Sequence, residues 1–200
     1  DSNGVQFVIN PYDEFGLTKA VMLKETIGGK VTVVTVGDIT AEPIIRKALA
    51  IGADEAFRIN TIAEDSFSTA IEIANYLKNN PADLIITGKE SSDYNGGAVG
   101  GMIAEMLDLP FINACNGLDI SENTAKISRE IDGGKEKISA DLPLVIGGQK
   151  GLVQESELRI PNMRGIMQSR TKPLQVIEPT NSDILTTSID FEKPAQKKAC

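Results

Sequence analysis

Short apolar runs alternate with amphipathic segments along the first half of the chain. The runs are five or six residues long, which is typical of strands that are buried on both faces. The intervening segments repeat apolar residues every three or four positions, which predicts helices. The expected strands are 5–9, 31–36, 54–59 and 83–87, and the expected helices are 11–27, 41–51, 66–79 and 102–107.

Four successive strand–helix pairs in about a hundred residues predict the α/β class, with a Rossmann-like parallel sheet that has helices on both faces. The pattern changes after Pro110, where short β segments at 117–120, 125–131 and 135–140 predict an appended β-hairpin turning at 132–134. Further strands are expected at 142–146 and 174–177, separated by a loop-rich stretch. We therefore expect one domain over residues 1–178 and a C-terminal tail over 179–200, which has low apolar density.

A glycine-rich segment at residues 88–101 lies between an expected strand and an expected helix. Such a loop leaves backbone amides unpaired at the positive end of the helix dipole, where phosphates bind in open α/β sheets. The alternative is a plain strand-to-helix connection, because a glycine-rich loop alone is a weak signal. No Walker pattern follows the glycines, so NTP hydrolysis is not expected.

Composition excludes several functional classes. A net charge of −8, from 20 basic and 28 acidic residues, argues against nucleic-acid binding. The absence of histidine excludes Ser-His-Asp and Cys-His catalysis and histidine-bound metals. Cys115 and Cys200 have no metal-like spacing, and we interpret Cys115 as a small buried hydrophobe in a reducing compartment. No apolar run reaches membrane-spanning length, so we expect no membrane insertion and a cytoplasmic, bacterial location.

Five motifs follow one another between residues 5 and 177. They are Asn-Pro-Tyr-Asp-Glu at 10–14, Arg-Lys-Ala-Leu-Ala-Ile-Gly-Ala-Asp at 46–54, Gly-Lys-Glu-Ser-Ser-Asp at 88–93 running on to Gly100, Arg-Glu-Ile-Asp-Gly-Gly at 129–134, and Ile-Met followed by Lys-Pro-Leu within 166–174. In this order and at this spacing they resemble the β subunit of electron transfer flavoproteins.

The resemblance implies a heterodimer with an α subunit that mainly holds FAD, and a structural AMP in this chain. It implies an electron carrier without catalytic side chains, whose FAD takes electrons from acyl-CoA or related dehydrogenases. The residues that it assigns to AMP are Asn10, Pro11, Tyr12, Asp13, Val36, Gly88, Lys89, Glu90, Ser91, Ser92, Asp93, Tyr94, Asn95, Gly96, Gly97, Ala98 and Val99.

Several positions depart from the family pattern. Tyr94 is unusual at the loop tip, and the family's first strand is expected to precede residue 1. Met163 stands where the family carries a leucine that engages dehydrogenases, and Met keeps an apolar anchor there. With Ile166 and Met167 it forms either a partner-docking patch or a small core under a loop.

Two other functions stay open at this point. The AMP site holds a second FAD if the chain is similar to electron-bifurcating relatives. Alternatively, the chain is a stand-alone adenine-nucleotide sensor of the same fold, which forms a homodimer without flavin.

Overall fold

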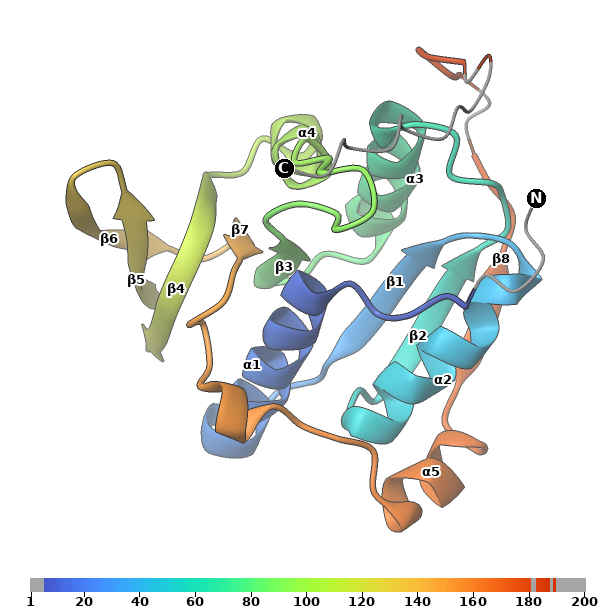
Figure 1. Ribbon diagram of the computed structural model, residues 1–200, viewed down its shortest axis with the longest axis horizontal. Helices are drawn as coiled ribbons and strands as arrows, with labels where there is room; N and C mark the ends of the chain where they lie inside the picture. Colours follow the sequence, from blue (N-terminus) through green and yellow to red (C-terminus); the bar gives the residue numbers. More distant parts are fainter. Residues whose placement is uncertain (1–5, 181–182, 188, 190–200) are drawn as a thin grey trace, which may run out of the picture.

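The computed structural model describes residues 6–180, 183–187 and 189, and they form a Rossmann-like α/β fold (Figure 1). The strands are β1 (Thr32–Val36), β2 (Glu55–Ile59), β3 (Leu84–Gly88), β4 (Phe111–Ser121), β5 (Thr124–Ile131), β6 (Gly134–Asp141), β7 (Leu144–Gly148) and β8 (Leu174–Ile177). The helices are α1 (Pro11–Ile27), α2 (Glu42–Ile51), α3 (Ser66–Asn79), α4 (Val99–Leu107) and α5 (Met163–Ser169), with short 3-10 turns at Ile39–Ala41 and Glu155–Glu157.

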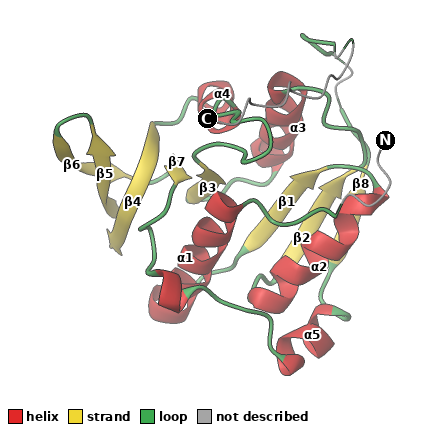
Figure 2. Ribbon diagram, in the orientation of Figure 1, coloured by secondary structure: helices red, strands yellow, loops and turns green. Residues whose placement is uncertain are grey.

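The strands form two sheets. Strands β1, β2 and β8 pair in that order and are all parallel. The second sheet has the order β3-β7-β4-β5-β6, in which β3, β7 and β4 are parallel and β4, β5 and β6 are antiparallel. Figure 2 shows α1 and α2 in front of the parallel strands, while α3 packs with α4. The expected α/β class and the appended hairpin are confirmed.

The hairpin between β5 and β6 turns at Asp132 and Gly133, as predicted. Gly133 has a φ of 85°, a conformation that glycine adopts without steric cost, and Ile131 pairs with Gly134 across the turn. The preceding strand β4 is much longer than the expected 117–120 segment, and it pairs with both β7 and β5. One long strand therefore joins the parallel and antiparallel parts of the sheet.

Three expectations about element bounds are wrong. Residues 6–9 form no strand, and Phe7 and Val8 are exposed with no neighbouring strand to satisfy their backbone groups. Helix α4 begins at Val99, three residues earlier than expected, because Gly100 packs against Phe111 and the end of β3. The stretch expected to be loop contains α5, whose three apolar residues have helical spacing.

The core is densest around β7, which is buried at every position between β3 and β4. Cys115 is fully buried in the same cluster, and burial raises the pKa of its thiol to about 12, against a lowering by Arg129. Cys115 is thus an inert part of the core, as the sequence indicated. This rigid sheet presents the carboxyl ends of β3 and β7 to the loop that follows β3.

Candidate functional site

The start of α1 is bonded directly to the loop after β3. The side-chain amide of Asn10 donates to the Glu90 carbonyl oxygen (2.9 Å), and its carbonyl oxygen accepts from the Ser92 amide (3.2 Å). The Asp13 carboxylate accepts from the Gly88 amide (2.7 Å) and from the Asn10 side chain (2.8 Å). These bonds bring together two motifs that lie about 80 residues apart in the sequence.

An asparagine directly before a proline favours a helix cap, and Asn10 does stand at the N-cap position of α1, but its side chain is used elsewhere. Its side chain makes no cap hydrogen bond, although Pro11 does occupy the first helical turn as predicted. Burial raises the pKa of Asp13 above its usual value, while the bonds from Asn10 and Gly88 act in the opposite direction. Both side chains serve the contact between α1 and the loop rather than α1 alone.

The rest of the loop is folded on itself. Lys89 continues the β ladder by donating its amide to Gly148 (2.9 Å), and Ser91 exchanges hydrogen bonds with Gly96 through its amide and its hydroxyl (2.9 and 3.2 Å). The Lys89 ammonium lies 5.4 Å from the centroid of the Tyr12 ring, on the α1 side of the loop. Tyr94 is exposed at the tip, so the structure gives it no role inside the loop.

The backbone amides around the start of α4 find no partner in the part of the chain that the structure describes. Within the described residues, no hydrogen bond engages the backbone N–H groups of Gly97, Ala98, Val99 or Gly100. Ala98 makes no side-chain cap hydrogen bond either. Four unpaired donors at the positive end of a helix, next to a glycine pair, fit a phosphate-sized anion.

The predicted AMP residues thus fall into two groups. Residues 10–13 and 88–99 come together at the carboxyl end of β3. Val36 ends β1 in the other sheet, and none of the hydrogen bonds of the described residues joins it to the loop. The hydrogen bonds of the described residues therefore join residues 10–13 to the loop but do not join Val36 to it.

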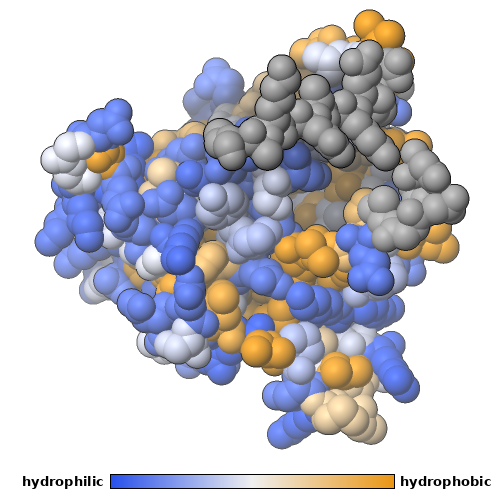
Figure 3. Space-filling model, in the orientation of Figure 1, coloured by the Kyte–Doolittle hydropathy of each residue, from blue (hydrophilic) through white to orange (hydrophobic). Residues whose placement is uncertain are grey.

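The predicted docking residues lie on α5 at the lower edge of the molecule in Figure 3, where apolar side chains stand among polar ones. Met163 is 77% exposed and Met167 67% exposed, and Ile166 is 40% exposed. They do not form a small core under a loop. Ile160, which precedes α5 in the chain and is 81% exposed, was not among the predicted residues, although an isoleucine between an arginine and a proline in a charged stretch was a usable signal.

The sequence also gave no sign of how the chain continues after β8. The Thr180 amide donates to both carboxylate oxygens of the buried Glu72 (3.0 and 2.9 Å). The amides of Leu185 and Thr186 donate to Asp65 at the start of α3 (2.8 Å each). The described part of the expected tail therefore lies on α3, and the boundary at residue 178 stays a prediction.

Two further features limit what the described residues can do. They contain no cluster of three or more histidine, cysteine or carboxylate side chains that could hold a metal ion. No helix among them has the length and apolarity needed to cross a lipid bilayer.

The fold and the loop geometry define an α/β protein with a glycine-rich loop at the carboxyl edge of its sheet, and comparison with known proteins identifies its family. Residues 1–182 match the electron transfer flavoprotein domain. The chain is 38% identical over 186 residues to the electron transfer flavoprotein subunit beta of Bacillus subtilis, covering 91% of this chain and 71% of that protein. It is 33% identical to the subunit of the same name from Syntrophomonas wolfei (98% and 77% covered), and 32% identical to protein FixA of Azotobacter vinelandii (86% and 64% covered). The chain belongs to the electron transfer flavoprotein family, as a β subunit.

Proposed function

We propose that this β subunit holds AMP as a structural nucleotide, with its phosphate at the start of α4. The supporting observation is that the four amides of residues 97–100 make no hydrogen bond to any described residue, in a loop that Asn10 and Asp13 fix to α1. A loop that is already ordered by its own hydrogen bonds binds an anion without a further entropic cost of ordering. The Ser91 hydroxyl, which accepts from the Gly96 amide (3.2 Å), adds a further polar group next to these residues.

The site favours retention of the nucleotide over its consumption. The neighbouring side chains contribute position and hydrogen bonds, and the segment contains no histidine or nucleophile–base pair that could cleave a phosphate. We infer an electron carrier subunit without catalytic side chains, paired with an α subunit that mainly holds FAD. The flavin supplies the redox chemistry, and this chain supplies binding and orientation.

We further propose that α5 docks the electron donor, an acyl-CoA or related dehydrogenase. Met163 and Met167 give α5 exposed apolar side chains, which are the kind of surface that marks protein–protein contacts. Methionine side chains are flexible and adapt to several partner surfaces, which suits a carrier that accepts electrons from more than one dehydrogenase.

The test of the nucleotide proposal is release of the bound ligand from the heterodimer with its α subunit. We expect denaturation to release one AMP and one FAD per heterodimer, measured by chromatography and ultraviolet–visible absorbance. Two FAD and no AMP would instead indicate a second flavin in this chain. A colourless homodimer that binds ATP would support the sensor function, and either result would overturn the AMP proposal.

A further inference from the structure

Helix α5 rests on the C-terminal turn of α2 through backbone contact. Gly165 of α5 lies so close to the carbonyl oxygen of Ala50 that a Cβ at position 165 would overlap it. The Asn162 side chain caps α5 by accepting from the Gly165 amide (2.8 Å), which fixes the first turn over this contact. Helix α5 therefore contacts α2 through Gly165, while its Met163 and Met167 side chains are exposed.

Arg46 of α2 holds the other end of α5. Its guanidinium Nη1 donates to the carbonyl oxygen of Ser169 (2.7 Å) and to that of Lys172 (2.8 Å). These two carbonyls lie at the last turn of α5 and just beyond it, where helix carbonyls have no partner inside the helix. A single side chain therefore fixes both the end of α5 and its connection to β8.

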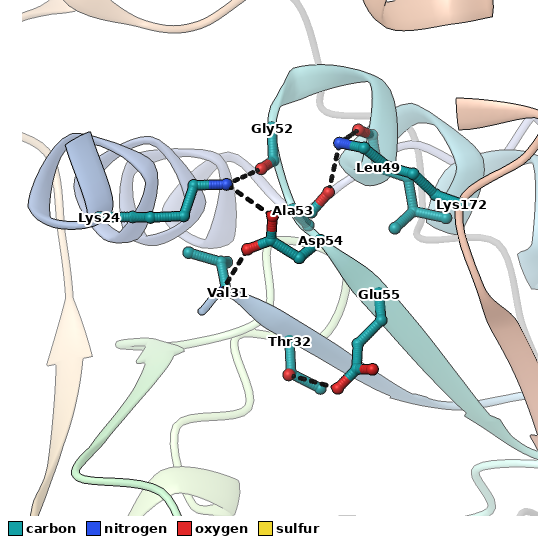
Figure 4. Close-up of polar contacts among 9 residues, drawn as sticks. All are labelled: Lys24, Val31, Thr32, Leu49, Gly52, Ala53, Asp54, Glu55 and Lys172. Atoms are coloured by element: carbon teal, nitrogen blue, oxygen red, sulfur yellow. Dashed lines mark hydrogen bonds and ion pairs between the residues drawn. The ribbon is translucent and has the colours of Figure 1, made fainter. Parts of the chain in front are cut away.

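Lys172 makes the reciprocal contact. Its ammonium donates to the carbonyl oxygens of Leu49 (2.9 Å) and Ala53 (2.5 Å), at and just after the C-terminal turn of α2. Figure 4 shows Lys24 approaching this turn from the other side, where it donates to Gly52 (2.8 Å) and Asp54 (2.9 Å). Two cations at the negative end of a helix are favourable, so the turn is held from both sides.

We propose that Arg46 and Lys172 are positioning residues for docking, because they fix the direction in which α5 presents Met163 and Met167. Neither residue belongs to the exposed apolar surface; each acts through the backbone of the other element. The geometry of the docking surface is thereby set by the end of α2, outside the surface itself. This inference rests on the proposed docking function of α5.

The test uses the heterodimer with its α subunit as electron acceptor for an acyl-CoA dehydrogenase and its acyl-CoA substrate. In R46A and K172M, we expect the KM for the heterodimer to rise roughly three- to tenfold with kcat little changed, as a loss of alignment predicts. Hydrogen exchange should increase at residues 163–171 and stay unchanged at residues 88–99. K172R keeps donors for both α2 carbonyls and should restore much of the wild-type KM.

The control is K47A, which removes a cation from the next position of α2. Lys47 donates to Glu14 of α1 (2.7 Å) rather than to α5, so its loss should leave both readouts at the wild-type level. Unchanged exchange at residues 163–171 in R46A would overturn the proposal, as would raised exchange without a change in KM. M163E distinguishes failure of the positioning role from failure of the docking role. If the KM of M163E equals that of the wild type, α5 does not dock the dehydrogenase, and the proposed docking function itself is wrong.

Discussion

The loop after β3 and the helix α5 are two candidate binding regions with opposite construction. In the loop, the polar side chains bind neighbouring backbone and one another: Asn10 and Asp13 hold residues 88–92 in place, and the amides of residues 97–100 make no hydrogen bond within the described residues. On α5, the apolar side chains of the surface are exposed, and Arg46 and Lys172 fix the helix from behind. The loop is suited to one small ligand, and α5 to larger and more variable partners.

The difference in construction predicts which property a substitution changes in each region. Within the loop, a change in one side chain should alter both stability and ligand binding, because the same hydrogen bonds serve both. On α5, a change in an exposed side chain should alter binding alone, because surface residues away from such networks contribute little to stability. Substitutions in the two regions test this difference directly.

The largest effect is expected from N10A. The substitution leaves the Glu90 carbonyl and the Ser92 amide without partners, which should lower the free energy of unfolding by about 2 kcal/mol. The AMP content of the heterodimer should fall with it, measured by chromatography after denaturation. The control is N123A, which removes an exposed turn amide with one 3.3 Å hydrogen bond. Full AMP content in N10A would show that the bonds between α1 and the loop do not serve the nucleotide.

The next effect is expected from M163E, which places a carboxylate in the apolar surface of α5. Desolvating this charge at an interface should weaken docking, with a KM for the heterodimer raised roughly tenfold, or about 1.4 kcal/mol. Flavin content and melting temperature should stay at wild-type values because Met163 is exposed. I131E makes the same kind of change at the far end of β5 and should leave the KM unaltered. A melting temperature that falls in M163E would contradict the comparison, since α5 would then be part of the fold's stability.

A smaller effect is expected at Gly97, where the glycine pair precedes α4. A Cβ there would lie 3.2 Å from the Lys89 carbonyl oxygen, so a side chain at this position crowds the loop as well as a bound phosphate. G97V should weaken AMP binding roughly fivefold, equivalent to about 1 kcal/mol, and G97A should weaken it less. Isothermal titration of nucleotide-depleted heterodimer measures both, with G134A as a control because Gly134 has open space around it. Equal affinity in G97V and wild type would exclude close approach of the phosphate.

The sequence predicted the strands and helices well because their periodicity is local. The hydrophobic pattern placed β1, β2, α2 and α3 within one or two residues. The role of Asn10 was misassigned because its partners lie about 80 residues away, and an asparagine before a proline suggests a cap by local rules. Helix α5 was missed because its apolar residues point outward, although positions 163, 166 and 167 have helical spacing. Local chemistry thus predicted the elements, while the site depends on contacts between distant segments.

The smallest effect is expected from a substitution of Asp65. This residue lies at the start of α3, near the loop, and bonds the segment that follows β8. It caps α3 by accepting from Ser68 (2.7 Å), and its other oxygen accepts from Leu185 and Thr186 (2.8 Å each). The start of α3 lies beside the loop, since a Cβ on Gly96 would be 3.9 Å from the Ser66 hydroxyl. Hydrogen bonds from the Ser68, Thr186 and Leu185 amides hold the pKa of Asp65 at about 2, below its usual 3.8.

A lowered pKa means that the folded state favours the charged carboxylate. The contribution of Asp65 to stability should be complete above about pH 4 and should disappear as the pH falls from 3.8 toward 2. In D65N the amide oxygen still caps α3, but the NH2 group that replaces the second oxygen cannot accept from the two C-terminal amides. The melting temperatures of wild type and D65N, followed by circular dichroism, should therefore differ slightly at pH 6 and converge near pH 2, whereas D119N, at an exposed site on β4, should show no such convergence. A constant difference across this range would mean that Asp65 acts only as a helix cap and that its bonds to Leu185 and Thr186 add no measurable stability.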